Sequence, residues 1–188
     1  TTYQLEGGTA LRPTQEFREG FNIAGDDVLC GLIERNVLPA LLEAIRASGA
    51  ANPEELLARR LGANRGDQAE RERTLRRQFA SQVALPLALA LLQRYESTDL
   101  TTSNEAVTFK LADVYPAGTG PHEQITAFLE EAVHAAGGQG FQLAEVVFST
   151  TMLAVDTTVR RILGQVLSDL CEVVHLYDCD YLLISGRP

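Results

Sequence analysis

The sequence predicts an α/β fold that is rich in helix, and three observations support this prediction. Of its 188 residues, 45% are hydrophobic and 22% are charged, which is the composition of a globular chain with a buried core. Between residues 28 and 176, apolar residues recur mostly at intervals of three and four, the spacing of amphipathic helices. Alternating or short apolar runs at the two ends, in 3–17 and 181–184, are typical of strands.

The N-terminal part is predicted to contain a β-hairpin followed by a helix. Apolar positions within 3–17 flank Gly7-Gly8, a pair that permits the positive φ angles of a tight turn. Asp26 suits the N-cap or first turn of the helix, because its carboxylate accepts hydrogen bonds from free amides at the positive end of the helix dipole. The apolar face of this helix covers 28–45, and Pro39 is expected to bend it.

The central part, from Pro53 to residue 111, is predicted to form two helices followed by one strand. Pro53 occupies the first position of a short helix, where its missing amide proton costs nothing. Residues 67–97 carry one long helical pattern, which is expected to kink at Pro86. After a polar turn, 106–111 alternates as a strand.

The C-terminal part is predicted to be two helices and a closing strand. Residues 122–135 form the first helix, and Gly137–Gly140 ends it. Phe141-Gln142-Leu143 is predicted to lead into the second helical region, which extends to Leu176, and the strand 181–184 follows it.

Charge and hydropathy exclude two classes of partner. The net charge of −9 disfavours a nucleic-acid surface, and the basic cluster is interleaved with Glu70 and Glu72, as on a solvated helix face. That cluster consists of Arg71, Arg73, Arg76 and Arg77. No membrane span is expected, because the apolar run Val83–Leu92 is far shorter than the ~20 residues a span needs and contains Pro86.

The ends and the cysteines indicate the context of the chain. It starts at Thr1 within a strand pattern and stops directly after another, so we interpret it as a piece of a longer protein. Three cysteines at irregular positions do not make a disulfide framework. The simplest expectation is a reducing compartment, the cytoplasm, with secretion of the parent protein as the alternative.

Cysteine and histidine residues give one weak metal pattern. Cys171, His175 and Cys179 lie four residues apart, which places them near one face of a continuous helix. One helix rarely closes a tetrahedron, and the neighbouring residues are apolar, so buried thiols are the preferred interpretation. Cys30 has no histidine near it in sequence, and neither a metal site nor a catalytic residue is predicted.

Two short segments are candidates for ligand contact. Ser185-Gly186-Arg187 follows the apolar strand 181–184, and its small residues let a ligand approach the backbone. Gly25-Asp26-Asp27 opens a helix and offers two carboxylates. Each segment also has a structural explanation, a strand-to-turn transition for the first and helix capping for the second.

The order of these features resembles the second lobe of the actin-like and Hsp70-like ATPase superfamily. There, a hairpin precedes a Gly-Gly-Glu-Asp type segment at a helix start, and a small-residue turn after the final strand meets adenosine. More narrowly, Glu19–Asp27 and Cys179–Pro188 look like the SrfB family of bacterial virulence factors.

The resemblance implies a ribonuclease-H-like lobe in three parts. These are the hairpin and helix in 1–49, a mostly helical inserted subdomain in 50–140, and the last helix and core strand in 141–188. It also implies that ATP with Mg²⁺ binds the parent protein and switches its conformation, through contacts with Gly25, Asp26, Asp27, Ser185, Gly186 and Arg187. Turnover by this piece alone is not expected, because both phosphate loops of the superfamily lie outside it. The alternative is a non-catalytic module that keeps the fold and binds other bacterial proteins.

Overall fold

The computed structural model describes residues 2–6, 10–14, 25–62, 69–99 and 106–178, and most of these residues are helical. The helices are α1 (Gly25–Leu32), α2 (Leu38–Ala47), α3 (Pro53–Leu61), α4 (Glu70–Phe79), α5 (Leu85–Glu96), α6 (Glu123–Ala135) and α7 (Met152–Leu176). The strands are β1 (Thr2–Glu6), β2 (Ala10–Thr14), β3 (Ala106–Lys110) and β4 (Val147–Thr151). The helix-rich character predicted from the sequence is confirmed.

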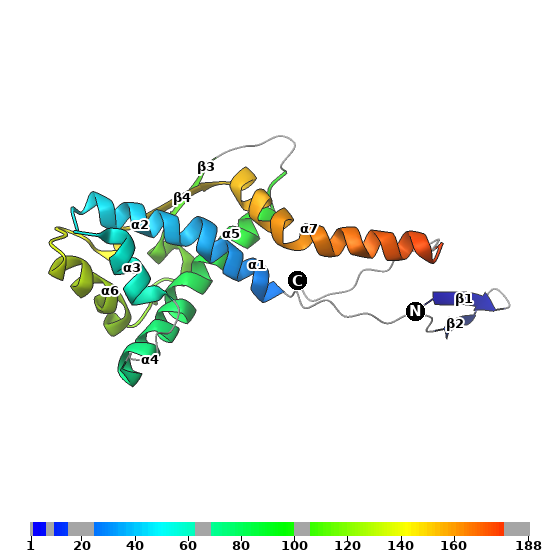
Figure 1. Ribbon diagram of the computed structural model, residues 1–188, viewed down its shortest axis with the longest axis horizontal. Helices are drawn as coiled ribbons and strands as arrows, with labels where there is room; N and C mark the ends of the chain where they lie inside the picture. Colours follow the sequence, from blue (N-terminus) through cyan, green and yellow to red (C-terminus); the bar gives the residue numbers. More distant parts are fainter. Residues whose placement is uncertain (1, 7–9, 15–24, 63–68, 100–105, 179–188) are drawn as a thin grey trace.

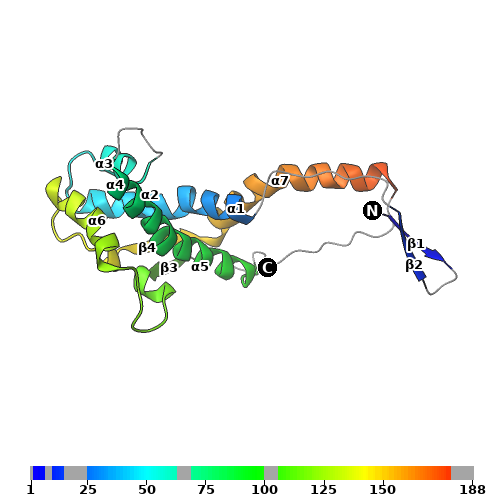
Figure 2. The same cartoon turned by 90° about the horizontal axis from the view of Figure 1, so that it is seen from below.

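The helices form a body from which α7 projects (Figure 1). Helix α1 packs against α5 and the first half of α7, while α2 packs against α3, and α4 against α6. The centre of this body is apolar, and the side chains of Leu32, Ile45, Leu87 and Leu129 are fully buried in it. Seen from below, α7 again extends well beyond the end of α1 (Figure 2).

Two helical segments, α1 with α2 and α4 with α5, each contain a π-helical turn directly before a Leu-Pro pair. The first turn, Ile33–Val37, joins α1 to α2 and precedes Pro39, and the second, Ala80–Ala84, joins α4 to α5 and precedes Pro86. Proline has no amide proton and collides with the carbonyl four residues earlier, so an ordinary helical turn cannot continue there. At Pro39 and at Pro86, where the sequence predicts a bend and a kink, the structure has one wider helical turn just before the proline.

The strands form two separate antiparallel pairs. Strand β1 pairs with β2 in the register Leu5↔Leu11, which confirms the predicted hairpin. Strand β3 pairs with β4 in the register Phe109↔Phe148, and these two rings stack with their centroids 6.1 Å apart.

The prediction that one long helical region follows Phe141-Gln142-Leu143 and extends to Leu176 is wrong in its first part. A short 3₁₀ turn, Leu143–Glu145, and strand β4 precede α7. Val146 and Phe148 are buried while Val147 and Ser149 are exposed, the alternation of a strand with one face on the core. Thr151 ends the strand and caps α7 by accepting a hydrogen bond from the Ala154 amide.

The finer parts of the predicted fold stay predictions. The closing strand 181–184 lies outside the described residues, so its pairing with the hairpin in one core sheet is untested. The same holds for the division into 1–49, 50–140 and 141–188, and for the actin-like lobe.

Candidate functional site

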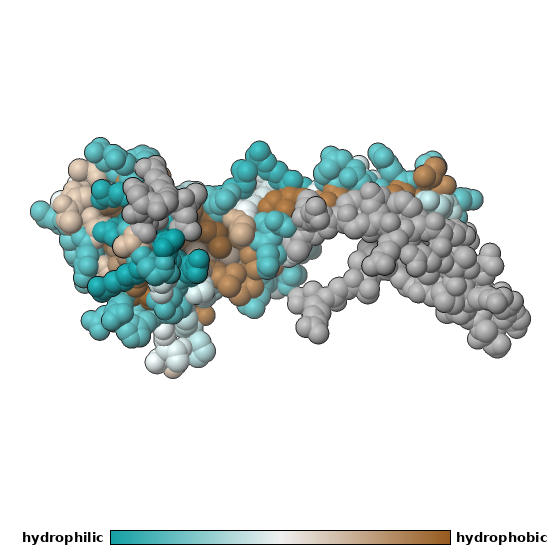
Figure 3. Space-filling view, turned by 60° about the horizontal axis from the view of Figure 1, so that its bottom comes forward, coloured by the Kyte–Doolittle hydropathy of each residue, from teal (hydrophilic) through white to brown (hydrophobic). Residues whose placement is uncertain are grey.

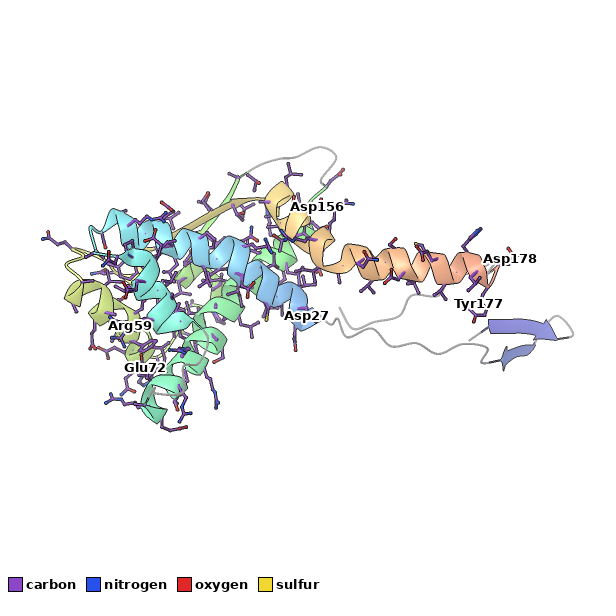
Figure 4. The ribbon with its side chains drawn as sticks, viewed as in Figure 1. Asp27, Arg59, Glu72, Asp156, Tyr177 and Asp178 are labelled. Atoms are coloured by element: carbon purple, nitrogen blue, oxygen red, sulfur yellow. The ribbon has the colours of Figure 1, made fainter. Side chains whose placement is uncertain are left out.

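The predicted nucleotide contacts fall in two places, of which the structure describes one. Gly25, Asp26 and Asp27 form the exposed first turn of α1, where Figure 4 labels Asp27. A Cβ atom added at Gly25 would have no neighbour within 4 Å, so the space beside this backbone is open. Ser185-Gly186-Arg187 lies outside the described residues, and whether the two segments meet is therefore untested.

From this turn, helix α1 runs along the first half of α7, the part that packs on the helical body and is called the root of α7 below. At their contact, a Cβ atom on Gly31 would lie 2.2 Å from the Cδ1 atom of Ile162. Only glycine at this position allows such close approach without movement of the isoleucine. The last turn of α1 and the first half of α7 are thus packed closely together.

A buried carboxylate lies at the root of α7, where the helix leaves the body. Asp156, labelled in Figure 4, is 7% exposed and accepts a 2.8 Å hydrogen bond from the Tyr95 hydroxyl. Its second oxygen lies 2.6 Å from Nε of Arg160, one turn along α7. The hydrogen bond from Arg160, followed by that from Tyr95, lowers the pKa of Asp156, while burial is the main cause that raises the pKa of Tyr95.

A second polar cluster links the π-helical turn Ile33–Val37 by hydrogen bonds to the end of β4 and the start of α7. Asn36 is buried and donates a hydrogen bond of 3.0 Å from Nδ2 to the Thr150 hydroxyl. Its side-chain oxygen accepts a 3.2 Å bond from the hydroxyl of Thr158, which is buried on α7. These bonds satisfy the amide of Asn36 in a place where an unpaired polar group is costly.

One arginine of the basic cluster is not on a solvated face. Arg76 is 9% exposed, and its guanidinium donates hydrogen bonds of 2.8, 2.8 and 3.1 Å to the carbonyls of Arg60, Gly62 and Arg59. These carbonyls belong to the C-terminal end of α3, where helices leave acceptors unpaired. Arg76 therefore caps α3 from α4, which corrects the prediction for this residue, while Arg71 and Arg77 are exposed as predicted.

A cavity opens beside this cap, between α3, α4 and α6, with a volume of about 360 Å³. Arg60 lines it, with the guanidinium carbon 5.1 Å from the centre of the Phe128 ring and one nitrogen 3.6 Å from Glu72, the residue labelled on α4 in Figure 4. Its wall is formed by Arg60, Ala69, Arg71, Glu72, Leu75, Gln124, Ala127, Phe128 and Glu131. Sequence reasoning missed this cavity because its residues come from three helices.

The metal pattern stays a weak one. The interpretation of buried thiols is wrong for Cys171, which is exposed, as are His175 and Cys30, while Cys179 lies outside the described residues. Among the described residues, no three histidine, cysteine, aspartate or glutamate side chains are placed to hold a metal ion together. In the same part of the chain, every helix is too short or too polar to span a membrane.

Together these observations define a helix-rich segment with a projecting helix, a polar root and a charged cavity. The chain belongs to the SrfB family, because the family model described as virulence factor SrfB matches residues 1–188. No curated protein and no solved structure matches the chain.

Proposed function

We propose that this segment of a SrfB protein is a helical interaction module that binds other bacterial proteins through the distal half of α7. The main support is the apolar face of α7, which continues past the helical body. Near the body, Met152 and Val155 are buried, and Thr158 is the last buried residue of the helix. Beyond it, apolar residues continue at intervals of three and four, namely Val159, Leu163, Leu167, Leu170 and Val174.

The exposure of this distal face supports binding rather than core packing. On this face Leu167 is 52% exposed. Figure 3 shows apolar side chains along the visible side of α7, next to its hydrophilic residues. An amphipathic helix whose apolar face extends beyond its own core is a common element of protein recognition.

Site-specific crosslinking in the full-length protein tests this function. With a photoreactive residue in place of Leu167, we expect discrete covalent adducts in the bacterium that makes the protein. The matched control is the same residue in place of Glu172, which is exposed on the opposite face of α7. Equal adducts at both positions, or none at either, would contradict the proposal.

A second candidate function is the ATP-dependent switch implied by the family resemblance. Its support among the described residues is the open space at Gly25 beside the carboxylates of Asp26 and Asp27. These carboxylates repel phosphate directly, so they fit a nucleotide only with Mg²⁺, whose bound water they can orient. The remaining contacts would come from Ser185, Gly186 and Arg187.

Titration of Mg-ATP into the full-length protein tests the switch. We expect saturable heat that Gly186→Leu abolishes, because the added side chain fills the turn that must approach the ligand. Asp27→Asn is expected to weaken binding by about ten- to hundredfold, since a charge-assisted hydrogen bond contributes roughly 1.5–3 kcal/mol. Gly120→Leu is the control, because a Cβ there meets nothing within 4 Å. Absence of heat from the folded protein, or normal binding by Gly186→Leu, would rule out this candidate.

A further inference from the structure

The cavity between α3, α4 and α6 has the size of a small-molecule site. Its volume of about 360 Å³ falls at the lower end of the range of ligand pockets. Leu75, Ala127 and Phe128 supply apolar surface to its wall, and Phe128 itself is 5% exposed. The cavity lies on the body of the molecule, and none of its lining residues belongs to α7.

Two arginines line the cavity, and Glu72 lies beside one of them. Arg60 is held over the Phe128 ring and lies 3.6 Å from Glu72, a distance too long for a full hydrogen bond. Arg71 is exposed and makes no ion pair with any described residue. Guanidinium groups bind carboxylates with two parallel hydrogen bonds, so this pair suits a carboxylate better than a neutral group.

One amide and one carboxylate on α6 also line the cavity. Gln124 and Glu131 lie two turns apart on the face of α6 that lines it, with Ala127 and Phe128 between them. Both side chains are exposed and make no ion pair or side-chain hydrogen bond with a described residue. Glu131 with Glu72 would repel a ligand that carries several negative charges, whereas Glu131 attracts an ammonium group.

We propose that this cavity binds a free amino acid with a large apolar side chain. Arg60 and Arg71 hold its carboxylate, Glu131 holds its ammonium group, and its side chain covers Leu75, Ala127 and Phe128. The wall carries two arginines, of which Arg60 also pairs with Glu72, a further carboxylate in Glu131, and apolar surface, so it offers a group for each of the three chemical parts of such a molecule.

Calorimetric titration of L-phenylalanine and L-leucine into the full-length protein tests the assignment. We expect saturable binding of at least one of them, and binding three- to tenfold weaker for the amide and the N-acetyl derivative, each of which lacks one charge. Arg71→Gln is expected to reduce affinity for the amino acid but not for its amide. Glu131→Gln is expected to reduce affinity for the amino acid but not for its N-acetyl derivative.

Exposed residues outside the cavity provide matched controls for these variants. Arg77→Gln on α4 and Glu123→Gln on α6 change the same charges on the same helices, and neither residue lines the cavity. Both are expected to bind like the unmodified protein. The proposal is overturned if neither amino acid binds saturably to the folded protein, or if the controls weaken binding as much as Arg71→Gln and Glu131→Gln.

Discussion

Replacing Arg76 with methionine is expected to destabilise the fold by about 3 kcal/mol. Methionine fills much of the same space, but the carbonyls of Arg59, Arg60 and Gly62 lose their donors at the end of α3. These acceptors are partly buried, and a buried acceptor without a partner costs more than the bond it loses. Urea unfolding of the variant followed by circular dichroism measures the change.

The neighbouring residue provides the control for Arg76. Arg77 is exposed in the same turn of α4, so Arg77→Met removes the same charge without uncapping α3. We expect this variant to unfold within about 0.5 kcal/mol of the unmodified protein. Equal destabilisation by both variants would mean that the charge of α4, and not the cap, is responsible.

Replacing Asp156 with alanine is expected to destabilise the fold by about 2 kcal/mol at neutral pH. The change removes the acceptor of the Tyr95 hydroxyl and the partner of Arg160 at the root of α7. The Arg160 side chain is 75% exposed and can return to water, so most of the cost arises at Tyr95. Glu172→Ala, on the exposed part of α7, is the control.

The effect of Asp156 is expected to depend on pH. Hydrogen bonding to Arg160 lowers the pKa of Asp156 in the folded protein, so its ionised form stabilises the fold above the pKa of the unfolded chain, about 3.9. That contribution is lost as the pH falls through the lowered pKa of the folded state. The difference between the unmodified protein and Asp156→Ala should therefore shrink between pH 5 and pH 2, and a constant difference would contradict this cause.

Helices were predictable from the sequence because their apolar spacing is local. The predicted segments 28–45, 67–97 and 122–135 correspond to the described helices to within a few residues and the two π-helical turns. Strand β4 was missed because its partner, β3, lies about forty residues earlier and its alternation is short. The role of Arg76 was missed for a related reason, since the carbonyls it binds lie 14 to 17 residues away on another helix.

The candidate sites differ in how far sequence could predict them. The exposed acidic turn at Gly25-Asp26-Asp27 was placed correctly at a helix start, because capping preferences are local. Its partnership with Ser185-Gly186-Arg187 came from resemblance alone and stays a prediction. The cavity required knowledge of how α3, α4 and α6 pack, which no pattern within one segment contains.

The two wider turns before Pro39 and Pro86 also affect how related sequences should be aligned. One extra residue turns an ordinary helix by about 100°, which would carry its apolar face away from the core. In this chain the extra residue is absorbed within Ile33–Val37 and Ala80–Ala84, and the buried side chains before and after each turn stay on the same side. A relative that lacks the proline has no need of the extra residue. A one-residue gap at either turn is therefore compatible with an unchanged fold, whereas a gap of the same size in α3 or α6 is not.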